Sequence, residues 1–191
     1  MSDAKTSKSA RALLYASLSA EQRDSVSETE RNAILSKAFA KGETAPAVGL
    51  DVLRAAELRR LKEKPLDTPD RLGRYASLLM ENLPPMSVVL CLTDKKRCLL
   101  ETHLLVSGPL SDDAKFLPLI PKLYKSSGAA YAAVFFAPRA AEYGFTGEDE
   151  QLATKITMYA KREKVFLLEC VVASFNDYIP LYRYYNYTFS L

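Results

Sequence analysis

Two apolar runs separated by a charged turn constrain the fold of this chain more than any other feature. Residues 86–93 and 98–106 are rich in Val, Leu and Cys, and Asp94-Lys95-Lys96-Arg97 lies between them. Strand-like runs that flank a short polar turn predict a hairpin of two antiparallel strands. The first run has few polar residues, which is typical of a strand buried on both faces of a sheet.

Five more elements are predicted after the hairpin, in the order helix, strand, helix, strand, strand: residues 112–127, 129–136, 147–163, 165–173 and 177–191. Pro118 and Pro121 must interrupt the first of these helices. A further helix is expected ahead of the hairpin, with Thr68 as its N-cap and Pro69 in its first turn. This order predicts the α/β (α+β) class, a mixed β-sheet flanked by helices.

The first part of the chain is predicted to be a helical segment, residues 1–65, that precedes a domain over residues 66–191. Its helices are expected over residues 10–22, 27–42 and 48–61. Ser27 and Glu30 form a capping box at the start of the second helix. A loop is expected over residues 43–47, and the third helix should turn Val52 and Leu53 inward.

No apolar run approaches the roughly 18–20 residues that cross a bilayer, and the N-terminus lacks the apolar core of a secretory signal. The three cysteines, Cys91, Cys98 and Cys170, form no CxxC pair. They are interpreted as buried, reduced core thiols. We therefore expect a cytoplasmic protein without a membrane partner.

The net charge of +3 is too small to indicate a nucleic-acid partner by itself. Basic residues do gather around the end of the third predicted helix: Arg54, Arg59, Arg60, Lys62 and Lys64. Positive charge suits a helix C-terminus, and contact with DNA is the alternative interpretation. The aromatic residues near the C-terminus, such as Tyr178 and Tyr182, predict an aromatic strand or a platform that stacks single-stranded nucleic acid.

The loop between the strand at 129–136 and the helix at 147–163 lies where an α/β domain places a ligand or metal site. Thr146 and Asp149 at its end match a helix cap. The single histidine, His103, lies two residues from Glu101 in a strand, so both side chains should face the same side. Such a pair has two interpretations. One is an acid–base pair or part of a metal site, and the other is a surface feature of a sheet edge.

Several segments, in this order, resemble the RadC family, bacterial members of the JAB/MPN (JAMM) metalloprotease-like fold. The resemblance covers about residues 66–182 and is carried by residues 66–70, 88–100, 104–108, 127–134 and 167–172. It implies a JAB/MPN (cytidine-deaminase-like) fold for the second domain and a traditional link to DNA repair. The sequence departs from the family pattern at Pro109, where the family has Thr, and at Glu169-Cys170, where it has Asp-His.

The resemblance also implies where a metal site would lie, because the family holds zinc with a Glu, a His-x-His pair and an Asp. Asp149 matches the Asp, and Thr146 stands for the Ser that precedes it. The His-x-His-Pro motif falls on Phe135-Phe136-Ala137-Pro138, and the glutamate falls near His103, one same-face step from Glu101.

Catalytic zinc needs about three protein ligands, and phenylalanine and alanine supply none. We therefore expect a catalytically inactive RadC-like protein without zinc, in which Phe135 and Phe136 fill the former site. It would act as a binding or assembly module for a protein partner or a second copy. The alternatives are a metal-dependent hydrolase with a displaced site built from Glu101, His103 and Asp149, and a DNA-associated protein.

Overall fold

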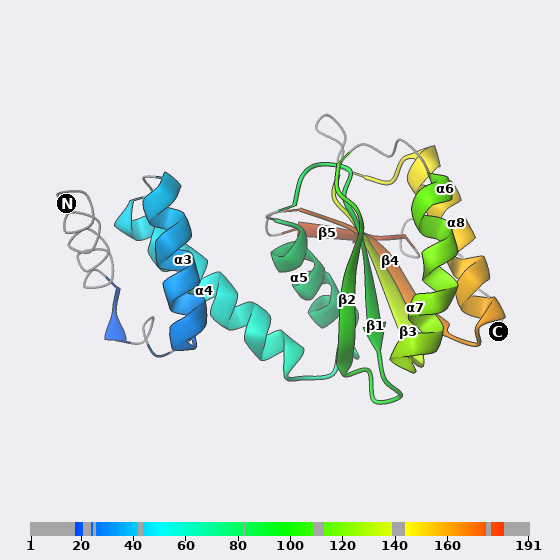
Figure 1. Ribbon diagram of the computed structural model, residues 1–191, viewed down its shortest axis with the longest axis horizontal. Coiled ribbons are helices and arrows are strands. Elements are labelled where there is room, and N and C mark those ends of the chain that lie inside the picture. The colour runs from blue at the N-terminus through cyan, green and yellow to red at the C-terminus, as the bar shows by residue number, and fades with distance from the viewer. Residues whose placement is uncertain are drawn as a thin grey trace. The chain divides into compact units, whose positions relative to one another are not determined.

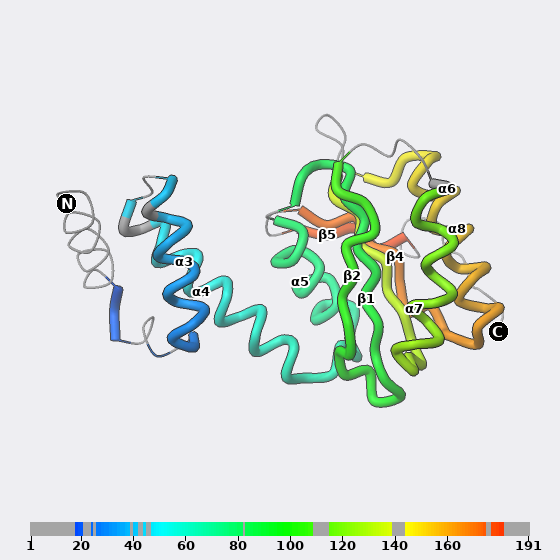
Figure 2. Tube along the Cα trace, in the orientation of Figure 1, coloured from blue at the N-terminus to red at the C-terminus, as the bar shows by residue number. Residues whose placement is uncertain are grey.

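The structure is a computed structural model that describes residues 18–20, 24, 26–41, 44–81, 83–108, 113–138, 144–174 and 177–181. The chain divides into two compact units, Met1–Arg60 and Leu61–Leu191. The division falls inside one helix and lies a few residues before the boundary at 65/66 expected from the sequence. Figures 1 and 2 trace the elements of each unit.

The first unit contains helix α3 (Glu28–Lys41) and most of helix α4 (Ala45–Lys62). The capping box is confirmed: the Glu30 N–H donates to Ser27 Oγ at 3.3 Å, and the Ser27 N–H donates to Glu30 Oε2 at 3.0 Å. The loop expected over residues 43–47 is wrong, because α4 begins at Ala45. Pro46 lies in its first turn, where a missing N–H costs no helical hydrogen bond.

A small apolar cluster holds the first unit together, built from Leu18, Val26, Leu35, Ala38, Val48 and Val52. The inward position predicted for Val52 is confirmed. The same prediction for Leu53 is wrong, because this side chain is 45% exposed. Most of the helix predicted over residues 10–22 lies outside the described residues.

The second unit is built on a five-stranded mixed sheet with the order β2-β1-β3-β4-β5. Its strands are β1 (Val88–Thr93), β2 (Leu99–Val106), β3 (Tyr131–Phe136), β4 (Phe166–Ser174) and β5 (Asp177–Pro180). The predicted hairpin is confirmed as the antiparallel pair β1–β2, and β3–β4 is parallel. The last predicted strand ends at Pro180, and most of the tyrosine-rich remainder lies outside the described residues.

Helices cover both faces of this sheet, as Figure 1 shows. Helix α5 (Pro69–Met80) packs on one face, and α6 (Asp113–Phe116), the 3-10 helix η1 (Leu117–Leu119), α7 (Ile120–Ser127) and α8 (Gly147–Arg162) lie on the other. Pro118 falls in η1 and Pro121 in the first turn of α7, so the predicted interruption is confirmed. We call the two sides the α5 face and the α8 face.

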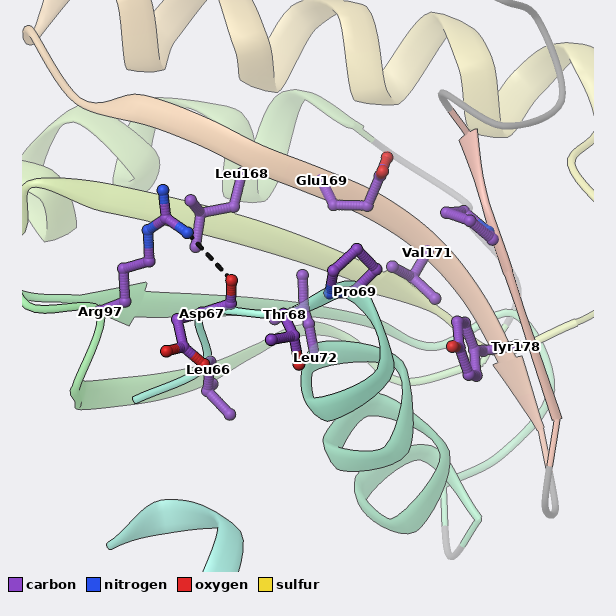
Figure 3. Close-up of a pocket in the computed structure, with 11 residues that line it drawn as sticks. Leu66, Asp67, Thr68, Pro69, Leu72, Arg97, Leu168, Glu169, Val171 and Tyr178 are labelled. Atoms are coloured by element: carbon purple, nitrogen blue, oxygen red, sulfur yellow. Dashed lines mark hydrogen bonds between the residues drawn. The ribbon is translucent and has the colours of Figure 1, made fainter. Parts of the chain in front are cut away.

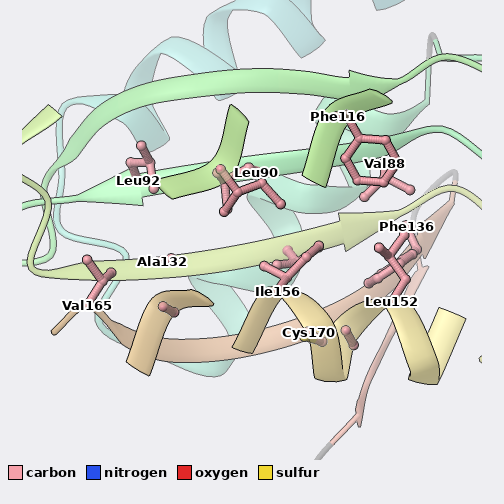
Figure 4. Close-up of a cluster of buried hydrophobic side chains, with 14 of the residues drawn as sticks. Val88, Leu90, Leu92, Phe116, Ala132, Phe136, Leu152, Ile156, Val165 and Cys170 are labelled. Carbon is pink, nitrogen blue, oxygen red and sulfur yellow. The ribbon is translucent and has the colours of Figure 1, made fainter. Parts of the chain in front are cut away.

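The main core lies between the sheet and the helices of the α8 face (Figure 4). Leu90 of β1 is in register with Val134 of β3, which is in register with Cys170 of β4. All three side chains are buried in this core. Cys91 is also buried, but Cys98 is only half-buried, so the prediction of buried thiols holds for two of the three.

Candidate functional site

The loop that resembles a metal site ends in a hydrogen-bonded cap at the start of α8. The Asp149 N–H donates to Thr146 Oγ1 at 3.3 Å, and the Thr146 N–H donates to Asp149 Oδ2 at 2.9 Å. The Thr146 hydroxyl adds a third bond to the same carboxylate oxygen at 2.7 Å. Asp149 is only 9% exposed. The carboxylate therefore holds the helix start, where the positive end of the helix favours it.

The two phenylalanines at the other end of this loop point to opposite faces of the sheet. Phe135 lies on the α5 face, where its ring meets the Tyr75 ring edge-on at 6.0 Å between centroids. Phe136 lies on the α8 face and meets Phe145 edge-on at 5.7 Å. The expectation that both rings fill one cleft beside Asp149 is therefore wrong. Only Phe136 lies on the face that α8 covers, because successive side chains of a strand alternate.

Ala137 continues the pairing of β1 and β3 beyond the end of the strand. Its N–H donates to the Ser87 carbonyl at 2.9 Å, and its own carbonyl accepts the Met86 N–H at 3.2 Å. Phe135 and Ala137 are both buried. These positions, which match histidines in the resemblance, therefore belong to the packed sheet and offer no donor atom to a metal.

Glu101 and His103 face the same side of β2, as alternation predicted. Glu101 Oε2 lies 2.7 Å from His103 Nε2, and both side chains are partly open to solvent. β2 is an edge strand of the sheet. An exposed pair of this kind has hydrogen-bonding capacity, but it lacks the enclosure that strengthens electrostatic effects in an active site.

Asp149 does not join this pair in a metal site. Within the described ranges, no three His, Cys, Asp or Glu side chains come together as ligands for one ion. Glu101, His103 and Asp149 all belong to those ranges. The displaced site that would have supported a hydrolase is therefore not assembled.

The basic residues proposed for DNA contact are partly engaged in ion pairs within the first unit. Arg54 Nη1 lies 3.5 Å from Asp51 Oδ1, and Arg59 Nη1 lies 3.9 Å from Glu30 Oε2. The remaining members of the group are exposed: Arg60, Lys62 and Lys64. Acidic neighbours at two of the five positions weaken an attraction for phosphate, and DNA contact stays a prediction.

A pocket of about 180 Å³ lies on the α5 face and was not predicted (Figure 3). The start of α5, the turn of the hairpin, β4 and β5 contribute the lining: Leu66, Asp67, Thr68, Pro69, Leu72, Arg97, Leu168, Glu169, Val171, Tyr178 and Pro180. Its walls combine apolar side chains with polar and charged ones, among them Asp67, Arg97 and Glu169. A mixed lining of this kind suits a small ligand or an inserted side chain.

Most polar groups around this pocket hold the chain that enters α5. Arg97 Nη1 donates to the Asp67 carbonyl at 3.1 Å, and Arg71 Nη1 donates to Asp67 Oδ1 at 3.0 Å. Tyr178 donates its hydroxyl to Asp70 Oδ1 at 2.7 Å, and its ring packs on Gly73. These bonds fix the architecture around the pocket. Arg97 and Tyr178 are far from α5 in sequence, so only the confirmed Thr68–Pro69 helix start signalled this region beforehand.

The chain matches no family model, and a search of curated proteins found no significant match to it. The resemblance to RadC proteins therefore remains a prediction. Within the part of the chain that the structure describes, no helix is both long enough and apolar enough to span a membrane.

Proposed function

We propose that this chain is a non-catalytic binding or assembly module whose second unit is a RadC-like JAB/MPN domain. The engagement of Asp149 in the α8 cap carries the proposal. This residue matches the family's metal-binding aspartate, and its Oδ2 accepts two hydrogen bonds from Thr146. The carboxylate acts here in folding.

The donor set at the matching positions supports the same conclusion. A catalytic zinc ion takes about three nitrogen, sulfur or oxygen ligands and leaves one position open for water. Phe135 and Ala137 have no donor atom in their side chains and are buried in the sheet. The residues present therefore do not fit the zinc ion that the resemblance implies.

The order of elements in the second unit supports the JAB/MPN proposal. A helix, a hairpin and alternating helices and strands build a mixed sheet covered on both faces. Folds of one architecture serve many functions, and the function depends on the site grafted on them. With the site positions used for packing and capping, binding a protein or a second copy is the function that remains best supported.

Metal analysis of the purified full chain tests this proposal. Protein produced in zinc-supplemented medium and purified without chelators should hold much less than one zinc per chain. The matched control is Asp149→Asn, which keeps the side-chain volume and should hold the same amount. Stoichiometric zinc in the wild-type chain that Asp149→Asn loses would overturn the proposal.

A further inference from the structure

No strand among the described residues pairs with the outer edge of β2. In the order β2-β1-β3-β4-β5, β2 has a neighbouring strand on one side only. Among the described residues, no backbone hydrogen bond from outside the sheet reaches Leu99–Val106. Every second residue of an edge strand leaves its N–H and C=O groups unpaired on the outer side. β2 can therefore accept a further strand along this edge.

β2 carries only part of the protection that is usual for such an edge. Edge strands commonly carry lysine or proline, or a bulge that twists the edge away. The sequence of β2, LLETHLLV, contains neither residue. Its irregularities lie near its two ends, and the register with β1 is regular over residues 101–104. The middle of the strand therefore presents a regular edge.

One exposed leucine, Leu100, directly precedes this regular stretch, and another, Leu104, is its last residue. Leu100 is 43% exposed and Leu104 is 49% exposed. Alternation places both on the α5 face with Thr102, whose Oγ1 lies 3.1 Å from the Tyr75 hydroxyl. Burying these leucines against other apolar side chains would remove hydrocarbon from water.

The sequence of β2 is complementary to itself in one antiparallel register. When two copies pair about a two-fold axis through Thr102, Leu100 of each copy lies opposite Leu104 of the other. In the same register Glu101 lies opposite His103, and Thr102 lies opposite Thr102. Apolar pairs, carboxylate–imidazole pairs and Thr–Thr pairs are all favourable across strands. We propose that the chain forms a homodimer through this β2–β2 pairing, which joins the two sheets into one.

The neighbouring registers that also place the α5 faces of both copies on the same side pair their side chains less favourably. The sequence therefore favours the register about Thr102. Pairing about Glu101 would set two carboxylates directly opposite each other, which is destabilising. Pairing about His103 would set Glu101 opposite Leu105 and Leu104 opposite Thr102. Only the register about Thr102 matches both the apolar and the polar side chains.

This inference rests on the proposed function and names the partner of the module as a second copy of the chain. Sedimentation velocity of the full chain over a concentration series tests it. We expect a monomer–dimer equilibrium that Leu104→Lys weakens by at least about tenfold in Kd. Leu119→Lys is the matched control, because Leu119 is also 49% exposed but belongs to η1 and not to the β2 edge. A chain that stays monomeric, or a dimer that both variants weaken equally, would overturn the inference.

Disulfide trapping tests the register. Directly opposite residues of antiparallel strands have Cβ atoms about 4.5–5.5 Å apart, so a small approach brings them to the roughly 3.5–4.5 Å that a disulfide spans. Thr102→Cys should therefore form a covalent dimer under mild oxidation. The wild-type chain and Thr154→Cys, an exposed position in α8, should not. Equal cross-linking of Thr102→Cys and Thr154→Cys would contradict the pairing.

Zinc content measured on the same samples separates the two proposals. A zinc-free monomer overturns the β2–β2 pairing and leaves the non-catalytic assignment standing. Stoichiometric zinc that depends on Asp149 overturns the proposed function, whatever the oligomeric state.

Discussion

The Thr146 hydroxyl and the Asp149 carboxylate lie 2.7 Å apart at the start of α8, and each side chain also bonds the backbone N–H of the other residue. This reciprocal pair satisfies two N–H groups that the first turn of a helix leaves without partners. The residue that most resembles a metal ligand thus has a complete structural role.

Thr146→Ala should lower the free energy of unfolding by about 1 kcal/mol, because it removes the N-cap acceptor. Urea denaturation monitored by circular dichroism measures the change. Thr154→Ala is the control in the same helix: its hydroxyl donates to the Glu150 carbonyl at 2.8 Å, a bond of a kind that adds little to helix stability. Equal losses in the two variants would contradict the capping role.

Gly73→Ala should destabilise the second unit, although alanine is the better helix former by about 1 kcal/mol. A Cβ atom at position 73 would overlap the Tyr178 ring, which the Asp70 hydrogen bond holds in place. Overpacking of this kind costs about 1–3 kcal/mol. Denaturant unfolding of the single variant gives the net effect.

The double variant Gly73→Ala/Tyr178→Ala isolates that contact. With the ring removed, Gly73→Ala should become neutral or stabilising relative to Tyr178→Ala alone, since only helix propensity remains. The contact between α5 and β5 would be refuted if Gly73→Ala stabilised the wild-type chain.

Two buried tyrosines should respond oppositely to loss of their hydroxyl groups. Tyr124 OH has no hydrogen-bond partner among the described residues, so Tyr124→Phe should be neutral or stabilising. Tyr75 bonds Thr102, so Tyr75→Phe should cost about 0.5–1.5 kcal/mol. Thermal unfolding measures the stability of both variants. A larger loss of stability for Tyr124→Phe than for Tyr75→Phe would contradict these hydrogen-bond assignments.

The stability of the fold should fall at alkaline pH. Burial raises the pKa of Cys91 from 9.0 to about 12 and the pKa of Tyr75 from 10.0 to about 12. As the pH rises, the unfolded chain loses these two protons at a lower pH than the folded chain does. The stability that the two groups contribute to the fold is therefore complete below pH 9.0 and is lost as the pH rises towards about 12. Urea titrations across this interval measure the slope.

Cys91→Ala should make the fall of the unfolding free energy with pH less steep, because it removes one of the groups whose pKa is raised in the folded chain. Cys98→Ala serves as the control, since Cys98 is only half-buried. Stability that rises with pH in the same interval would mean that these groups are not buried as described.

Local signals allowed much of the fold to be predicted. Ser27 with Glu30 and Thr68 with Pro69 marked helix starts correctly, because a cap depends on residues only a few positions apart. The same-face relation of Glu101 and His103 followed from strand alternation alone. The start of α4 was missed because Pro46 was interpreted as a loop residue, although proline is favourable in a first helical turn.

The arrangement around the candidate site depended on contacts that sequence spacing does not contain. Alternation would have placed Phe135 and Phe136 on opposite faces, but the resemblance to a metal loop led to both being assigned to one cleft. The pocket beside α5 needs Arg97 and Tyr178, which sheet topology brings to Asp67 and Asp70. The pairing order of the strands decides such contacts, and no local pattern encodes it.

Isothermal titration of zinc into the full chain tests most directly whether Asp149 serves the fold or a metal. The wild-type chain and Asp149→Asn should give the same heats, because neither has a zinc site built on this carboxylate. A one-to-one zinc isotherm in the wild-type chain that disappears in Asp149→Asn would contradict it.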